Sequence, residues 1–193
     1  MKDVVKLTLK LFVICAVAAA LLGATYSCTK EPIAQGNAMR AMESRQEVLS
    51  NVDDFEKIDV EALKSSGEWV DDEENHVTIT EAFYGIKDGK RDGMTVKVET
   101  KGYNPGIEMT VGFLLDGTVE AISIGSHEET PGLGANADEP EFKDQFRGAV
   151  PHLALGSGEN EIDSLTSATK TSVGIINGTN VAYDFFMSVY DKE

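Results

Sequence analysis

Cysteine is nearly absent from this chain of 193 residues. Its two cysteines, Cys15 and Cys28, both lie in an apolar segment near the N-terminus. The rest of the sequence therefore has no disulfide framework, no CxxC pair and no cysteine-based zinc or iron–sulfur site. Histidine is almost as scarce. His76, His127 and His152 are widely spaced and form no HxxxH pair, so the spacing proposes no metal site.

Basic residues are also few. The chain has 17 Lys and Arg against 33 Asp and Glu, a formal net charge of −16. Neutralising nucleic-acid phosphates needs clustered Lys and Arg, so the composition argues against nucleic acid as a partner. The first 28 residues hold three lysines and one aspartate, which leaves −18 on residues 29–193. An apolar content of 41% with 26% charged residues is typical of a folded protein.

One long apolar run is present. Residues 11–29 are 19 uncharged positions, about 28 Å of helix, close to the hydrocarbon thickness of a bilayer. Lys6 and Lys10 precede the run and Pro32 follows it. A basic flank on this side favours a cytoplasmic N-terminus and an exported remainder. We therefore expect residues 1–34 to form a cytoplasmic start and one transmembrane helix, an uncleaved single-pass anchor in the cell (inner) membrane.

Two other interpretations of this segment exist. A cleaved signal peptide also has a basic start and an apolar core. A lipoprotein signal would place the lipid on Cys28, but the preceding Thr-Tyr-Ser differs from the usual Leu-small-small approach. The length of the run and its flanks favour the anchor.

The exported part is predicted to begin with a stalk. Residues 35–58 read as a polar amphipathic helix, with Met39, Met42 and Leu49 on one face. We expect residues 35–60 to set the distance between the membrane and a single domain over residues 61–193.

Four segments alternate between apolar and polar residues and are rich in β-branched and aromatic types. They are separated by short turns, including the hairpin signal at Asp116 and Gly117. Short connections predict antiparallel pairing. The strands are expected at residues 76–85, 94–100, 107–115 and 118–126.

Two helices are predicted after the strands. Residues 139–148 suggest a short helix closed by Gly148. The final segment, residues 170–190, has apolar residues near helical spacing, and Gly174 and Gly178 would let it approach a neighbour closely. These apolar positions are Val173, Ile176, Tyr183, Phe186 and Tyr190. The predicted fold class is α+β, a single domain whose antiparallel sheet is flanked by helices.

The loop SHEETPGLG follows the fourth predicted strand. Gly132 and Gly134 permit backbone angles that are closed to other residues, so backbone amides can turn toward a ligand. The loop also supplies a histidine, two carboxylates and a hydroxyl. The alternative is an ordinary strand-to-helix loop with an exposed histidine, since this composition is common in loops.

The stretch DSLTSATKTS places six hydroxyl residues around the start of the final helix. A helix N-terminus presents unpaired amides and a partial positive charge, which stabilise a phosphate. Lys170 adds positive charge, and the small Ser167 and Ala168 leave room beside Thr169. The pattern indicates a phosphate site, with the phosphate free or bonded to a hydroxyl. The alternative is that Thr166 or Ser167 only caps the helix. No GKS/T is present, so this is not a nucleotide P-loop.

Together these segments resemble a known family, the FMN-binding G subunit of the Rnf complex, a membrane-bound ferredoxin:NAD⁺ oxidoreductase. The C subunit of the sodium-pumping NADH:quinone oxidoreductase is a related family. The resemblance covers nearly the whole chain, from the anchor ending in TKEPIA to DSLTSATKTS near the C-terminus. Its most specific part is KGYNPGIEMTVGFLLDGTVEAISIGSHEETPGLG.

In that family the short motif reads approximately Asp-x-x-Ser/Thr-Gly-Ala-Thr, and a separate flavin transferase joins FMN to the last threonine through a phosphoester. By position, the resemblance implies that Thr169 is the acceptor and that serine stands at 167, where glycine is common. The implied cofactor site around Thr169 comprises Asp163, Thr166, Ser167, Ala168, Lys170 and Thr171. The loop implied to lie against the flavin ring supplies His127, Glu129, Thr130, Gly132, Leu133 and Gly134.

The implied function is electron relay within a membrane complex that couples electron transfer to Na⁺ or H⁺ translocation. The implied partners are the other membrane and peripheral subunits, and the transferase during maturation. The FMN domain would lie on the outer face of the membrane. Two alternatives stay open: the quinone-reducing relative or another extracytoplasmic flavin carrier, and an anchored anion-binding module without flavin.

Overall fold

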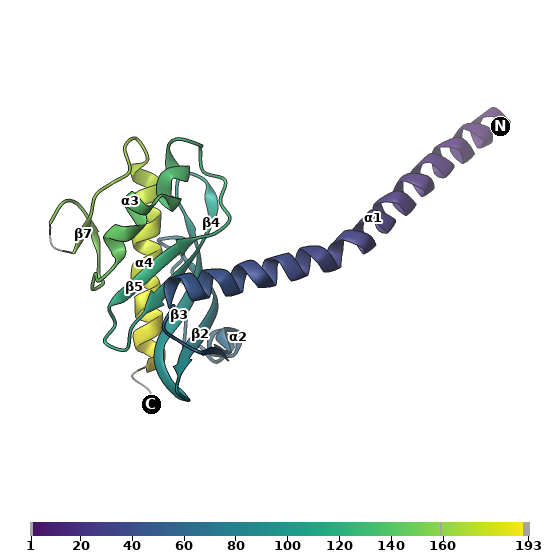
Figure 1. Ribbon diagram of the computed structural model, residues 1–193. Coiled ribbons are helices and arrows are strands. Elements are labelled where there is room, and N and C mark those ends of the chain that lie inside the picture. The colour runs from purple at the N-terminus through teal and green to yellow at the C-terminus, as the bar shows by residue number, and fades with distance from the viewer. Residues whose placement is uncertain (1, 159, 191–193) are drawn as a thin grey trace. The chain divides into compact units, whose positions relative to one another are not determined.

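A computed structural model describes residues 2–158 and 160–190 (Figure 1). The chain divides into two compact units, Met1–Met42 and Glu43–Glu193, which are described separately. The second unit holds a five-stranded antiparallel sheet flanked by helices, so the predicted α+β class is confirmed. The strands lie side by side in chain order: β1 (Asp54–Ile58), β2 (Thr78–Lys87), β3 (Lys90–Lys101), β4 (Pro105–Phe113) and β5 (Val119–Ile124).

Short turns connect the last four strands. Asp88 and Gly89, between β2 and β3, both have positive φ, 50° and 73°, the geometry whose twist matches that of the flanking strands. Between β4 and β5, the Leu114 N–H donates to the Thr118 carbonyl at 2.9 Å around Gly117, whose φ is 83°. The four strands predicted from the sequence are therefore confirmed, with shifted ends.

Strand β1 corrects the helix predicted over residues 35–58. The helix α1 (Lys2–Val48) ends at Val48, and β1 then pairs with β2, from Asp54 opposite Ile86 to Ile58 opposite Ala82. The segment is mostly polar and exposed, so its sequence lacks the apolar alternation of a strand. It becomes a strand because the backbone groups along the edge of β2 need hydrogen-bond partners, whatever side chains the added strand carries.

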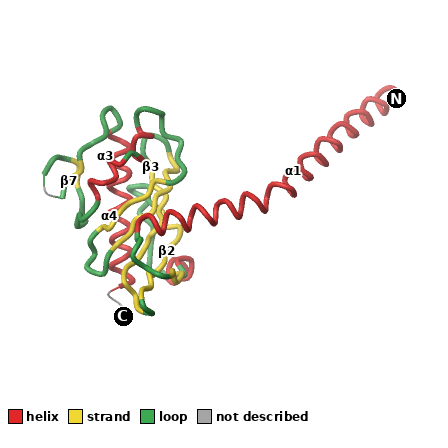
Figure 2. The backbone as a smooth tube through the Cα atoms, viewed as in Figure 1, coloured by secondary structure: helices red, strands yellow, loops and turns green. Residues whose placement is uncertain are grey.

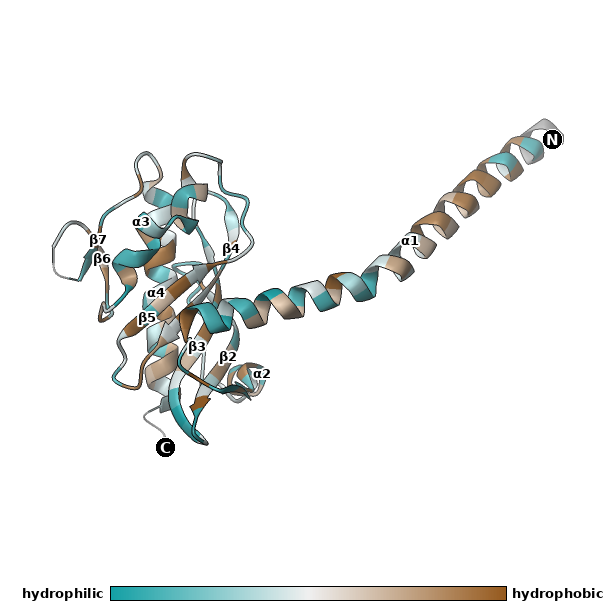
Figure 3. Cartoon of the chain, in the orientation of Figure 1, coloured by the Kyte–Doolittle hydropathy of each residue, from teal (hydrophilic) through white to brown (hydrophobic). Residues whose placement is uncertain are grey.

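The helix α1 also runs unbroken through Pro32, where the sequence predicts that the anchor helix ends. Proline removes one backbone hydrogen bond and kinks a helix, but it does not stop one whose flanking residues continue it. Between Lys6 and Val48, an unburied 18-residue window has a mean hydropathy of 2.3. Figure 3 shows the apolar residues concentrated in the N-terminal half of α1. By length and composition, this part suits a membrane-spanning helix.

The helix α4 (Thr169–Tyr190) lies along one face of the sheet (Figure 2). Its closest approach is at the two glycines, where Gly174 meets the backbone of Lys101 and Gly178 meets Met109. The stripe of buried residues along α4 is centred on these two glycines. The predicted apolar face is therefore only partly right: Val173 is exposed, and the large buried residues are Ile175, Ile176, Val181, Phe185 and Phe186.

The opposite face of the sheet receives the C-terminal end of α1. Gly85, Gly93 and Gly112 lie on three neighbouring strands. A Cβ at Gly85 or Gly112 would collide with Leu49 or Val48, and one at Gly93 would lie only 3.1 Å from Leu49. Val48 and Leu49 are fully or almost fully buried there, with exposed fractions of 0% and 2%. The last turn of α1 is therefore part of the core of the second unit.

An ionic cluster also holds this end of α1. The Lys143 ammonium lies 2.9 Å from an Asp138 oxygen and 3.2 Å from a Glu47 oxygen, and the Ser123 hydroxyl donates to Glu47 at 2.6 Å. Burial opposes the charge of Lys143, but its hydrogen bond to Asp138 and the nearby Glu47 outweigh this and raise the pKa of the ammonium. Lys143 thereby ties α1 to the short helices that follow β5.

The remaining elements are short. The helix predicted over residues 139–148 is confirmed as two consecutive pieces, and Gly148 follows them with a φ of 76°. The short elements are α2 (Val60–Ser66), η1 (Gly134–Asp138), α3 (Pro140–Lys143), η2 (Asp144–Phe146), β6 (Ala154–Leu155) and β7 (Glu161–Ile162).

Candidate functional site

The N-terminus of α4 is the centre of the candidate site. Thr169 is the first residue of the helix and is exposed, whereas Ala168 before it is buried. The Ser172 N–H donates to the Ala168 carbonyl at 3.1 Å, the first hydrogen bond within the helix. The N–H groups of residues 169–171 have no acceptor within the helix, as in any first turn. They lie beside the Thr169 hydroxyl and can bind an anion there.

The turn before the helix is closed by its own side chains. The Leu165 N–H donates to the Ser172 hydroxyl at 2.9 Å, and that hydroxyl donates to the Ala168 carbonyl at 3.3 Å. Ser167 has a φ of 61°, in the left-handed region that favours glycine. This is the position at which glycine is common in the motif that the sequence resembles. The backbone bend therefore accounts for the small residue there.

A pocket of about 500 Å³, the Thr169 pocket, opens beside this helix start. Its size lies within the range of small-molecule and cofactor sites. Three segments build it: the loop after β5, the first turn of α4 and the loop between β3 and β4. The lining residues are Tyr103, Glu129, Thr130, Leu133, Gly134, Ser167, Ala168, Thr169, Lys170 and Thr171.

A buried carboxylate holds these three segments together. Glu129 is 6% exposed, and each of its carboxylate oxygens accepts one hydrogen bond. Oε2 accepts from the Thr171 hydroxyl at 2.7 Å, and Oε1 accepts from the Asn104 N–H at 2.9 Å. Gly102 and Gly134 leave the space that the carboxylate occupies, because a Cβ at either would collide with it.

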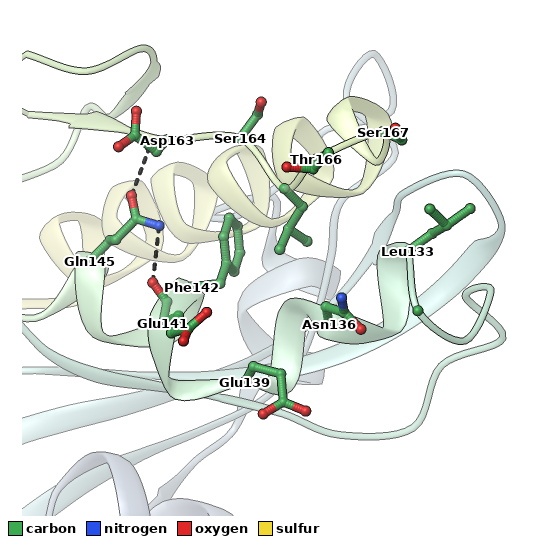
Figure 4. Close-up of a pocket in the computed structure, with 12 residues that line it drawn as sticks. Leu133, Asn136, Glu139, Glu141, Phe142, Gln145, Asp163, Ser164, Thr166 and Ser167 are labelled. Carbon is green, nitrogen blue, oxygen red and sulfur yellow. Dashed lines mark hydrogen bonds between the residues drawn. The ribbon is translucent and has the colours of Figure 1, made fainter.

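A second pocket of about 390 Å³, the Asp163 pocket, adjoins the first and shares Leu133 and Ser167 with it (Figure 4). The Asp163 N–H donates to the Gln145 side-chain oxygen at 2.8 Å, and the Gln145 amide donates to the Glu141 carbonyl at 3.3 Å. These bonds fasten the segment before α4 to α3 and η2. The remaining lining residues are Gly132, Asn136, Glu139, Phe142, Ser164, Leu165 and Thr166.

Twelve of the thirteen site residues named from the sequence line one or both of these pockets. The exception is His127, which lines neither. Its Nδ1 accepts a hydrogen bond from the Glu129 N–H at 3.3 Å, so the ring is engaged by its own loop.

Sequence reasoning missed several residues of the two pockets, among them Tyr103 and Gln145. Tyr103 is 67% exposed, and its ring lies 5.7 Å from the Lys170 ammonium. The sequence did carry a signal for Tyr103: an aromatic residue at the tip of a Gly/Pro turn, a position where burial in a core does not explain an aromatic side chain. Gln145 carries no such signal, because its role depends on a contact with Asp163, 18 positions away.

Residues 102–184 match the FMN-binding domain family. The G subunit of the Na(+)-translocating ferredoxin:NAD(+) oxidoreductase complex of Acetobacterium woodii is 35% identical, over 97% of this chain and 94% of that protein. The G subunit of the ion-translocating oxidoreductase complex of Methanosarcina acetivorans is 30% identical, over 95% of each.

The crystal structure of Shewanella oneidensis NqrC shares the fold, with a TM-score of 0.50 at 22% identity. That match covers 58% of this chain and 59% of NqrC, less than two thirds of either. The similarity to the two G subunits, in contrast, runs from end to end and includes both the apolar helix and the pocketed domain. This chain belongs to the family of G subunits of Rnf-type ion-translocating oxidoreductase complexes.

Proposed function

We propose that this protein is the electron-relay subunit of an Rnf-type complex and carries FMN bound covalently through a phosphoester to Thr169. The observation that carries the proposal is the position of Thr169. Its hydroxyl is exposed at the first residue of α4, on the wall of a cofactor-sized pocket, within the segment that matches the FMN-binding domain.

The residues around Thr169 suit a phosphoester. The free N–H groups of the first helical turn and the partial positive charge of the helix N-terminus stabilise its negative charge. Lys170 adds a full positive charge next to the acceptor. Ser167 and Ala168 have small side chains, so the approach to the Thr169 hydroxyl is not blocked. Formation of the ester adds one FMN to the chain with the formal loss of one water.

The Thr169 pocket suits the flavin ring. Tyr103 and Leu133 offer an aromatic and an aliphatic surface on its wall, and both are exposed in the structure. Such surfaces favour a flat, largely apolar ring system. FMN supplies the electron-carrying chemistry, and the protein supplies the binding, the orientation and the electrostatics. A covalent link keeps the cofactor on a domain that faces an open aqueous compartment.

The N-terminal half of α1 serves as a single-pass membrane anchor in this proposal. Lys6 and Lys10 favour a cytoplasmic N-terminus and an FMN domain on the outer face. One helix does not form an ion path, so ion movement belongs to partner subunits and this chain relays electrons. The Acetobacterium woodii relative is named for Na⁺ translocation, and the Methanosarcina acetivorans relative for an unspecified ion. For this chain the coupled ion is Na⁺ or H⁺.

Two other functions share this site. A C-type subunit of a quinone-reducing complex has the same fold, but the end-to-end relatives favour the G-type subunit. An anion-binding module would use the same helix N-terminus without a flavin. Its ligand would be released on denaturation, which distinguishes it from a covalent cofactor.

The test is the intact mass of the full chain produced together with a flavin transferase, followed by fragmentation of the modified peptide. We expect one FMN less one water, located on Thr169. Thr169→Val should lose the adduct, whereas the matched control Ser164→Ala should keep it, because Ser164 is an exposed hydroxyl residue at a variable position of the motif and precedes the helix. An unmodified wild-type chain, or an adduct on Thr166, would contradict the proposal.

A further inference from the structure

The surroundings of the Glu129 carboxylate are unusual. A residue that only holds three segments together does not need to be a buried charged group. A carboxylate buried away from water is costly unless its charge is compensated. In the described part of the chain, no lysine or arginine lies within ion-pair distance of it. Its two hydrogen bonds come from neutral donors, the Thr171 hydroxyl and the Asn104 N–H. Both oxygens act as acceptors, which is the pattern of an ionised carboxylate.

The position of this group is as unusual as its burial. Glu129 lies on the wall of the Thr169 pocket, next to Thr130 and Gly134 on the same loop. Lys170 supplies a positive charge to the pocket lining, but it is exposed and lies over the Tyr103 ring. A fixed negative charge therefore borders the pocket from the protein side, where solvent screens it least.

We propose that Glu129 lowers the reduction potential of the flavin held in the Thr169 pocket. The inference rests on the proposed function, because it needs a flavin there. Reduction adds two electrons to the ring, and a buried anion nearby raises the energy of the added negative charge. Thr171 has a supporting role, since its hydroxyl hydrogen-bonds to the carboxylate and disperses part of its charge.

The substitution Glu129→Gln removes the charge and preserves the shape. The glutamine oxygen can still accept from the Asn104 N–H, and the glutamine amide can donate to the Thr171 oxygen. The matched control is Glu128→Gln. Glu128 is the neighbouring residue and is exposed to solvent. Its substitution changes the net charge of the protein by the same amount as Glu129→Gln, but at a position where solvent screens the charge.

The experiment is a spectroelectrochemical titration of the full chain with its attached flavin, at one fixed pH for all variants. We expect Glu129→Gln to shift the midpoint potential to a more positive value and Glu128→Gln to leave it near that of the wild type. Equal potentials for Glu129→Gln and the wild type, or equal shifts in the two variants, would overturn the proposal.

A second variant makes a prediction of opposite sign, which matters if Glu129→Gln does not fold. Thr171→Val keeps the side-chain volume and removes the hydrogen bond to Glu129. The negative charge of the Glu129 carboxylate is then less dispersed. The potential should become more negative, and an unchanged or more positive value would argue against the role of Glu129. A wild-type chain without flavin would instead refute the proposed function. A flavin-loaded set of variants with one common potential would refute only this inference.

Discussion

At the scale of single residues, a few backbone and side-chain positions determine the site. Four described non-glycine residues have positive φ: His76, Asp88, Asn160 and Ser167. The first three are of types that tolerate this conformation, and serine is not. Ser167 is therefore the exception, and it lies two positions before the proposed acceptor. The bend that it provides separates the two pockets and exposes the start of α4.

The first prediction follows from this strain. Ser167→Gly removes the Cβ that disfavours a left-handed conformation, a gain of about 1 kcal/mol that the greater freedom of unfolded glycine partly offsets. Ser167→Ala removes the hydroxyl and keeps the Cβ. We expect the glycine variant to be more stable than the alanine variant by about 0.5 kcal/mol. Thermal unfolding of the detergent-solubilised chain measures this, and an alanine variant of equal or higher stability would contradict it.

At the scale of elements, α4 does two things at once. Its first turn supplies the proposed attachment site, and its body covers one face of the sheet. The two are linked through Gly174, whose backbone meets Lys101 at the end of β3. The Thr100 hydroxyl also donates to the Gly174 carbonyl at 2.9 Å. The helix start is thereby held at a fixed distance from the β3–β4 loop that carries Tyr103.

The second prediction compares the two helix glycines. Alanine should gain roughly 1 kcal/mol of helix propensity at either position. At Gly174 the new Cβ would collide with the backbone of Lys101, which cannot move aside. We expect Gly174→Ala to lose about 2 kcal/mol in the free energy of unfolding.

Gly178→Ala is the matched control for this substitution. Its new Cβ would meet the Met109 sulfur at 2.9 Å, and a flexible methionine side chain can shift. Its loss should be less than about 1 kcal/mol. Denaturant titration gives both values, and the idea of a fixed backbone contact fails if Gly174→Ala is the milder change.

At the scale of the whole molecule, the boundary between the two units lies within a continuous helix. The first unit ends at Met42, but Val48 and Leu49 belong to the core of the second unit. Glu47 adds the contact with Lys143 and Ser123. The last turn of α1 is therefore both the continuation of the long N-terminal helix and a structural part of the pocketed domain.

The third prediction uses two truncations. A chain of residues 43–193 keeps this last turn and should be a water-soluble, folded protein. A chain of residues 50–193 loses Val48 and Leu49, two buried side chains whose removal costs about 2–5 kcal/mol each in comparable substitutions. We expect a markedly lower melting temperature for the shorter chain by circular dichroism. Equal melting temperatures would show that the end of α1 is not part of the core.

The sequence alone determined the elements whose signals are local. The apolar run predicted the long N-terminal apolar helix, and alternation with Gly-containing turns predicted the four consecutive strands, because these patterns depend on neighbouring residues. The proposed attachment motif is a prediction from the sequence, through its resemblance to a family with the same spacing. The missed elements have no such signal. Strand β1 is polar, and it forms only because the edge of β2 offers backbone partners.

Tertiary structure alone decided how the site is assembled. It brought Tyr103, Glu129 and Thr169 to one pocket from three segments, and turned His127 toward its own loop. It also buried Glu129 between two neutral donors, which depends on the space left by Gly102 and Gly134. Local sequence encodes the torsional preferences and the apolar periods of each segment. Burial, charge environment and contacts between distant segments arise only when the segments pack together.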